Sequence, residues 1–214
     1  MRPIVFSHIP KTAGTALRLA LWANFDQSEI LPNLRDLALN SGEYTPLKTV
    51  IQRLKASNKY KLVAGHYPMD IAQHLDNPRT IVVLREPAAR LLSLYRHRIS
   101  HGLTTPEDVL ASFQKGVVPS SRNGMAKYLA ACAVDSSDEE LFQKASNVLR
   151  TIDIVGVTDN MRRVAEKLEA WEIHLPDKKV NPARSDFQLP TEYINMIHDQ
   201  NVIDAKLYEI ASNL

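Results

Sequence analysis

Four short apolar runs, rich in β-branched residues, predict the strands of a buried sheet. They lie at residues 3–7, 61–64, 80–84 and 152–157. Within each run, apolar side chains follow one another almost without interruption instead of alternating with polar ones. This pattern is typical of parallel strands that are covered by helices on both faces.

Stretches with the helical spacing of apolar residues alternate with these runs. We expect helices at residues 14–24, 87–101, 161–171 and 191–212. The apolar face of the second helix is predicted to contain Ala88, Leu92, Tyr95 and Ile99. Arg90, Ser93 and His97 then lie on its open side. Strands that alternate with helices predict an α/β fold with a central, mostly parallel sheet.

The composition narrows the class of protein without pointing to a function. With 214 residues, the chain is predicted to form a single domain, residues 1–214. Its net charge of +2 gives no support for a nucleic-acid partner. Cys132 is the only cysteine, which excludes an internal disulfide, and its apolar surroundings predict a core position. No apolar stretch reaches a membrane span of roughly 20 residues and no signal-peptide pattern is found, so we expect a cytoplasmic protein.

The first candidate site is the loop HIPKTAGT, residues 8–15, between the first strand and the first helix. Helix N-termini that follow a strand bind anions, because their first N–H groups have no partner within the helix. Gly14 allows a ligand to approach the backbone, Thr12 and Thr15 offer hydroxyl groups, and Lys11 adds a positive charge. The alternative is an ordinary turn with a surface lysine. The order of residues differs from the nucleotide-triphosphatase pattern G-x-x-x-x-G-K-[ST], since lysine here precedes glycine.

Two further candidates follow the second and third strands. Arg85 comes at the end of a strand, and Ser93 lies two helical turns farther on, so together they could bind a second phosphate. A salt bridge from Arg85 to Glu86 or another carboxylate is the alternative. His66, in GHYP, could accept a proton from a hydroxyl nucleophile, or it could serve only as a structural hydrogen-bonding group. His97 and His101 have helical spacing without a metalloprotease pattern, so we expect no metal.

Taken together, these motifs resemble sulfotransferases that use 3′-phosphoadenosine 5′-phosphosulfate (PAPS). They are similar to the branch of heparan-sulfate 2-O-sulfotransferases and their small bacterial relatives. HIPKTAGT resembles the 5′-phosphosulfate loop of that family, LREPAARLLSLYRH its 3′-phosphate segment, and GHYP the position of its catalytic histidine. RNGMAKYL, DIVGVTDNMRRVAEKL and VNPARSDFQLP also have counterparts there, so the resemblance covers most of the chain.

The resemblance implies a P-loop-like three-layer fold and assigns roles to residues. Lys11 and His66 would be catalytic, with Lys11 stabilising the leaving phosphate and His66 as the base. PAPS would be bound by Lys11, Thr12, Ala13, Gly14, Thr15, Ala16, Arg85 and Ser93. The acceptor would be a hydroxyl group of a carbohydrate or a small molecule, and no metal would be required.

Two other interpretations of the same residues remain open from the sequence. One is a nucleotide-dependent kinase or NTPase with an atypical P-loop, which would need a magnesium-binding carboxylate at a strand end. The other is a non-catalytic module that binds an adenine nucleotide. Residues 26–60 and 101–121, where the lid and the acceptor site are expected, carry no recognisable acceptor motif.

Overall fold

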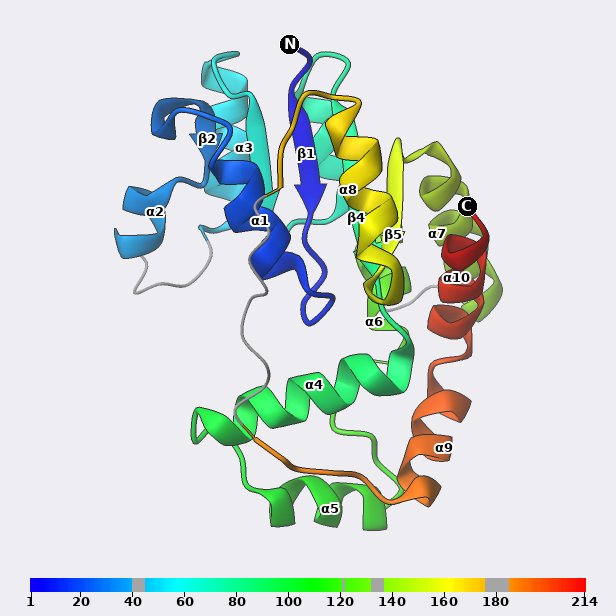
Figure 1. Ribbon diagram of the computed structural model, residues 1–214. Coiled ribbons are helices and arrows are strands. Elements are labelled where there is room, and N and C mark those ends of the chain that lie inside the picture. The colour runs from blue at the N-terminus through cyan, green and yellow to red at the C-terminus, as the bar shows by residue number, and fades with distance from the viewer. Residues whose placement is uncertain (40–44, 121, 132–136, 176–184) are drawn as a thin grey trace.

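The computed structural model describes residues 1–39, 45–120, 122–131, 137–175 and 185–214. Cys132 and part of the VNPARSDFQLP motif lie outside these residues. The described chain forms an upper α/β part and a lower group of helices, with the longest of the lower helices directly below the sheet (Figure 1). None of the described helices is both long and apolar enough to cross a membrane.

The central sheet contains five strands, all parallel, in the order β2-β3-β1-β4-β5. The strands are β1 (Ile4–Ser7), β2 (Ile30–Leu31), β3 (Leu62–Gly65), β4 (Arg79–Leu84) and β5 (Ile154–Val157). The four strands predicted from apolar runs are therefore confirmed. The two-residue strand β2 is too short to stand out in the sequence.

The register of the strands decides which residues meet at the carboxyl edge of the sheet. Ser7 pairs with Gly65 of β3, so the next residues, His8 and His66, leave the sheet at the same level. On the other side of β1, β4 runs on to Leu84. The loop after β1, His66 and Arg85 are thus brought to one edge, as the sequence predicted.

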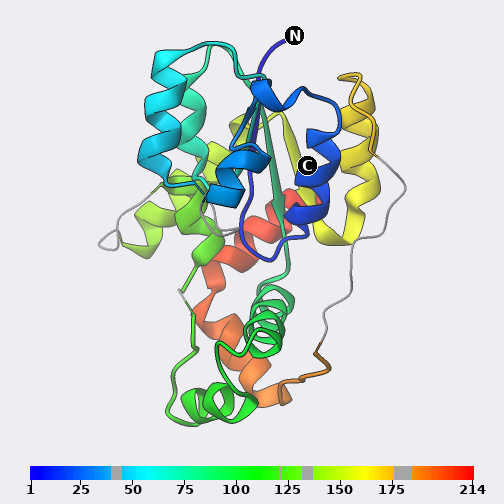
Figure 2. The same cartoon turned by 90° about the vertical axis from the view of Figure 1, so that its left-hand side faces the viewer.

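Helices cover both faces of the sheet and give the three layers (Figures 1 and 2). On one face, α1 (Gly14–Trp22) and α8 (Met161–Glu169) pack on Phe6, Val83 and their neighbours. On the other face lie α3 (Leu47–Ala56), α6 (Gly124–Ala130), α7 (Asp138–Thr151) and α10 (Val202–Asn213). The predicted α/β three-layer fold is confirmed.

The lower group consists of α4 (Pro87–Ser100), α5 (Pro106–Gln114) and α9 (Thr191–Gln200). These helices pack around an apolar cluster of their own, in which the Phe113 ring lies edge-on to Tyr95 and stacks on Tyr193. The remaining elements are α2 (Leu34–Leu39) and the short 3₁₀ helices η1 (Gln27–Glu29), η2 (Met69–His74) and η3 (Thr158–Asn160). Helix α4 therefore forms the floor beneath the carboxyl edge of the sheet (Figure 1).

Two predictions about the helices were wrong. The expected last helix, residues 191–212, is divided at Asn201 into α9 and α10, because the Asn201 side chain bonds to Ile197 O and to the N–H of Asn123. Arg90 was expected on the open side of α4, but it is 5% exposed, since it pairs with the buried carboxylate of Asp204. Leu91 joins Ala88 and Tyr95 on the buried face, while Leu92 and Ile99 are only half-buried.

Candidate active site

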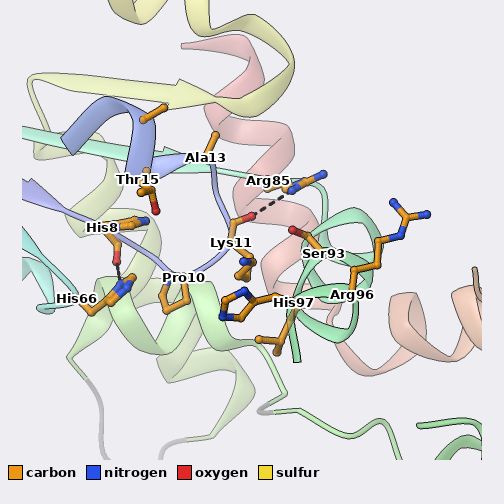
Figure 3. A pocket seen from close by; sticks show the side chains of 13 residues that line it. His8, Pro10, Lys11, Ala13, Thr15, His66, Arg85, Ser93, Arg96 and His97 are labelled. Atoms are coloured by element: carbon orange, nitrogen blue, oxygen red, sulfur yellow. Dashed lines mark hydrogen bonds between the residues drawn. The ribbon is translucent and has the colours of Figure 1, made fainter. Parts of the chain in front are cut away.

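A cavity of about 730 Å³ lies between the carboxyl edge of the sheet and helix α4 (Figure 3). All the predicted site residues except Thr12 line it: Lys11, Ala13, Gly14, Thr15, Ala16, His66, Arg85 and Ser93. They come from the loop after β1, the start of α1, the end of β3, the end of β4 and the middle of α4. Segments that are far apart in the sequence thus contribute to one site.

The loop after β1 has an unusual backbone that is suited to holding an anion. Lys11 and Ala13 have left-handed φ angles of 69° and 60°, a conformation that costs a non-glycine residue about 1 kcal/mol or more. No side chain caps α1, so the N–H groups of its first turn, from Gly14 onward, are left for a ligand. Strain of this kind gathers where a loop clamps a ligand.

Thr12 stabilises this loop from within. Its side chain is 0% exposed, and its hydroxyl group donates a hydrogen bond of 2.9 Å to Ile9 O. The Thr12 hydroxyl therefore fixes the turn and does not face the cavity, unlike the hydroxyl-bearing Thr15.

Arg85 and Ser93 lie across the cavity from the start of α1 (Figure 3). The guanidinium group of Arg85 donates a hydrogen bond of 3.3 Å to Lys11 O, which ties the end of β4 to the loop. Among the described residues, no carboxylate forms an ion pair with Arg85. Glu86, the partner suggested as an alternative, instead accepts hydrogen bonds from Ala88 N and Ala89 N and caps α4. Arg85 thus has a positive charge to offer to a ligand.

His66 is held in one tautomer by the backbone. Its Nδ1 lies 2.6 Å from His8 O, and since a carbonyl only accepts, Nδ1 donates the proton. The lone pair of the neutral ring is then on Nε2. Burial lowers the pKa of His66 and outweighs the hydrogen bond to His8 O, which raises it, while Arg18 and Lys11 lower it further. The ring is therefore neutral near pH 7 and can accept a proton.

Positive side chains predominate in the lining of the cavity, although the carboxylates of Asp159 and Glu86, outside the lining, partly offset the lowering of the Arg85 pKa by burial. The described lining carries the cations Lys11, Arg85 and Arg96 and no carboxylate. Burial and the charge of Arg85 lower the pKa of Lys11. Cations that repel one another in a half-buried cavity are stabilised when an anion enters it. The arrangement can therefore bind a ligand with at least two anionic groups, one at the loop and one near Arg85.

Several residues that also line the cavity were given no role from the sequence: His8, Pro10, Leu94, Arg96 and His97. His8 could have been found from its place directly after β1, and Arg96 and His97 from their helical spacing to Ser93. The next histidine along the chain after His66 is His74, at the end of η2, and it does not line the cavity. Among the described residues, no group of three or more His, Cys, Asp or Glu side chains could hold a metal ion.

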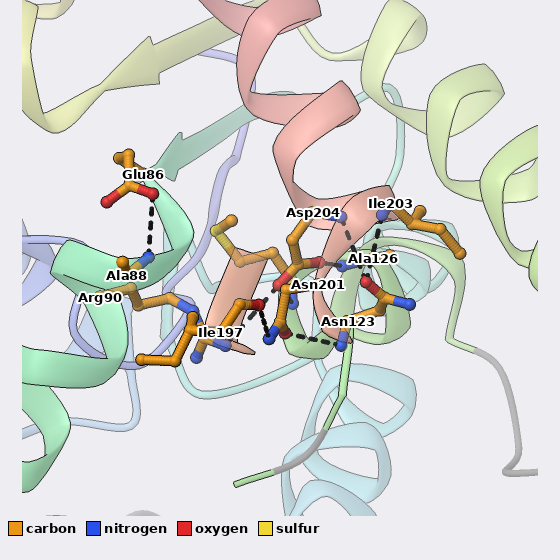
Figure 4. A network of polar contacts seen from close by, with 10 residues as sticks. Glu86, Ala88, Arg90, Asn123, Ala126, Ile197, Asn201, Ile203 and Asp204 are labelled. Atoms are coloured by element: carbon orange, nitrogen blue, oxygen red, sulfur yellow. Dashed lines mark hydrogen bonds and ion pairs between the residues drawn. The ribbon is translucent and has the colours of Figure 1, made fainter. Parts of the chain in front are cut away.

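A second polar cluster joins α4 to the helices α6 and α10, and its two opposite charges pair with each other (Figure 4), although Nε and Nη2 of Arg90 have no hydrogen-bond partner among the described residues. The Arg90 guanidinium lies 3.6 Å from Asp204, which is 0% exposed. The two carboxylate oxygens of Asp204 accept hydrogen bonds from Met125 N and Ala126 N, at the start of α6. The Asn123 side chain accepts from Ile203 N, at the start of α10. We call Arg90, Asn123, Asn201 and Asp204 the junction, because they join α4, α6, α9 and α10.

Comparison with protein families places the chain. Residues 2–151 match the model of the sulfotransferase family. This range includes the loop after β1, His66 and the segment from Arg85 to Ser93, and it ends with the last residue of α7. A search of curated proteins found no significant match.

Proposed function

The chain belongs to the sulfotransferase family, and on this premise we propose that it transfers a sulfuryl group from PAPS to a hydroxyl group of a carbohydrate or small molecule. The observation that carries the proposal is the pair of cationic sites in one cavity, Lys11 with the start of α1 on one side and Arg85 with Ser93 on the other. PAPS carries two anionic groups of this kind, a 5′-phosphosulfate and a 3′-phosphate.

The donor would be held at both of its anionic ends. The N–H groups at the start of α1 and the side chain of Thr15 would bind the 5′-phosphosulfate. Arg85 and Ser93 would bind the 3′-phosphate through charge-assisted hydrogen bonds. ATP has no 3′-phosphate, so the second site would favour PAPS over ATP.

In the transfer step, the acceptor oxygen attacks sulfur while the bond from sulfur to the 5′-phosphate oxygen breaks. Nε2 of His66 takes the proton of the attacking hydroxyl group, as its fixed tautomer allows. The electron pair of the broken bond stays on the phosphate, whose growing charge Lys11 neutralises. The products are the sulfated acceptor and 3′-phosphoadenosine 5′-phosphate (PAP).

A test of this function does not require that the acceptor be identified first. The protein is incubated with radiosulfate-labelled PAPS and an extract of its own cells, with and without EDTA, and the products are examined for the mass gain of one SO₃ group. We expect labelled products in both samples, because Lys11 and the N–H groups of the loop supply the charge that a metal would supply in a kinase. A strict requirement for a divalent metal would favour the kinase hypothesis. Binding of PAPS without any transfer would favour the non-catalytic module.

A further inference from the structure

The imidazole of His8 lies in the candidate active site, but it has no role in the proposed transfer step. Its ring stacks on Phe6, with 5.5 Å between centroids, and lies 4.3 Å from the ring of His66 on another side. Its edge lies against Gly14, where an added Cβ would come within 2.0 Å of the ring. The residue is only 3% exposed, so neighbouring groups surround the ring closely.

The two ring nitrogens of His8 are in different surroundings. Nδ1 is buried and has no hydrogen-bond partner in the described part of the chain. Nε2 belongs to the edge that meets Gly14, where α1 begins and the cavity opens (Figure 3). Because Nδ1 is fully buried and His8 lines the cavity, Nε2 is the nitrogen that a ligand there would meet.

The His8 ring is neutral, and this decides what it can do. Its pKa is lowered to about 2, chiefly by burial and further by His66, Arg18 and Lys11, the charged and titratable groups around it. A neutral ring carries one proton. We assign it to Nε2, because a buried N–H without an acceptor is rarer in proteins than a buried acceptor without a donor. An N–H at Nε2 also faces a cavity built for anions.

We propose that His8 is a further residue of the transfer site, whose neutral imidazole donates a hydrogen bond from Nε2 to an oxygen of the sulfuryl group in transit. This inference rests on the proposed function. The position of the ring supports it, since His8 lies between His66, which would contact the attacking oxygen, and Gly14, in the loop that would hold the 5′-phosphate. His8 keeps its proton throughout, and the bonds that form and break are those described above.

The two histidines would then have complementary roles that the backbone fixes. His66 carries its proton on Nδ1, bound to His8 O, and offers a lone pair from Nε2. His8 carries its proton on Nε2 and offers a donor. A donor that is fixed in a site poor in water stabilises a transition state without having to reorient. One residue would accept a proton while its neighbour stabilises the group that moves.

Two variants distinguish a hydrogen-bond donor role of His8 from a role in packing alone. In His8→Gln, the amide nitrogen can reach the position of Nε2, whereas in His8→Asn the amide lies where Nδ1 was. The rate is measured as release of PAP from PAPS in a single turnover with water as the acceptor, so no acceptor has to be known. We expect His8→Gln to stay within about tenfold of the wild type and His8→Asn to lose about 10²–10³-fold in rate. His174→Gln, at an exposed histidine outside the cavity, is the matched control.

The affinity for PAP and the melting temperature complete the test. PAP has no sulfuryl group, so the wild type and both variants should bind it equally well. Folded variants with equal rates would overturn the role of His8, although the proposed function would stand. A wild-type protein that neither binds PAP nor releases it from PAPS would overturn the proposed function and this inference with it.

A spectroscopic readout tests the assignment of the proton directly. NMR spectra of the side-chain nitrogens report which nitrogen of each histidine carries the proton. We expect His8 to be protonated on Nε2 and to show no titration between about pH 8 and about pH 5. A proton on Nδ1 of His8 would overturn the inference whatever the rates of the variants.

Discussion

Two groups of charged and polar side chains involve helix α4, and they differ in whether the described chain supplies each charge with a counter-charge. In the junction, the carboxylate of Asp204 receives two backbone N–H groups and lies 3.6 Å from the guanidinium of Arg90. In the cavity, the described lining has no carboxylate to pair with the side-chain charges of Lys11 and Arg85.

The difference separates charges that stabilise the fold from charges that are available to a ligand. A buried charge with partners is strongly destabilising only when one partner is removed. The cavity places like charges beside a strained loop, which lowers stability, and an anion that binds there would offset this cost. Changes in the cavity should therefore affect turnover and binding, whereas changes in the junction should affect folding.

The largest effect on activity is expected from His66→Ala. Without the base, kcat should fall by about 10²–10⁴-fold while the affinity for PAP stays nearly the same. In the wild type, the neutral ring is the active form, so activity should fall as the pH drops through the lowered pKa of His66, below about pH 6.5. The variant should lack this acidic limb. The pH–rate curves of the wild type and the variant measure this effect, and His74→Ala is the control. Near-normal turnover of His66→Ala would remove His66 from the mechanism.

Asp204→Asn tests the junction. The substitution keeps the shape of the side chain but leaves the charge of Arg90 buried without a counter-charge, which costs about 3–5 kcal/mol. For a chain of this size, the melting temperature should fall by roughly 6–20 °C. Asp199→Asn, at an exposed position in α9, is the matched control. Melting at the wild-type temperature would show that the pair contributes little.

Lys11→Ala should affect turnover more than binding. The charge on the leaving phosphate develops only in the transition state, so kcat should fall by about 10²–10³-fold with a small change in the affinity for the acceptor. The melting temperature should not fall, because the substitution removes a half-buried cation that Arg85 repels. Full kcat combined with weaker binding of PAPS would limit Lys11 to holding the donor.

Arg85→Ala should weaken the binding of PAP by about 1.5–3 kcal/mol, the usual range for a charge-assisted hydrogen bond in a cavity. The affinity for AMP should change much less, since AMP has no 3′-phosphate. Calorimetry with both nucleotides on the wild type and the variant measures the difference. An equal loss of affinity for the two would contradict the role of Arg85.

The smallest effect concerns stability in acid. Because the pKa of folded His8 is about 2 and that of an unfolded histidine is about 6.5, the unfolded chain binds the extra proton between these values. The free energy of unfolding should therefore decrease as the pH falls, by about 2 kcal/mol between about pH 6.5 and about pH 5. The free energy of unfolding, measured with urea, should depend less on pH in His8→Gln than in the wild type. The same dependence in both proteins would show that His8 is not held neutral by the fold.

Much of the upper part of the fold could be predicted from the sequence because its strands are apolar on both faces. The helices α5 and α7 were missed, although the capping boxes that begin at Thr105 and Ser137 are visible in the sequence. The break at Asn201 depends in part on Asn123, which is 78 residues away along the chain. The burial of Arg90 depends on the charge of Asp204, in α10. Local periodicity contains no information on such contacts.

The candidate site was predicted from motifs more than from pattern. Four residues stood out because they have suitable side chains and follow the ends of predicted strands: Lys11, Gly14, His66 and Arg85. The parallel register of the strands brings them together. What the sequence could not give is orientation. That the Thr12 hydroxyl closes the loop, and that His8 presents its backbone oxygen to His66, follows only from the geometry.

The most direct test of the account is the affinity of the wild-type protein for PAP compared with AMP, measured by calorimetry. The two nucleotides differ only in the 3′-phosphate that Arg85 and Ser93 are proposed to bind. We expect PAP to bind about 10–150-fold more tightly, which corresponds to about 1.5–3 kcal/mol. Equal affinities would contradict the central claim that the cavity is built for a nucleotide with two anionic ends.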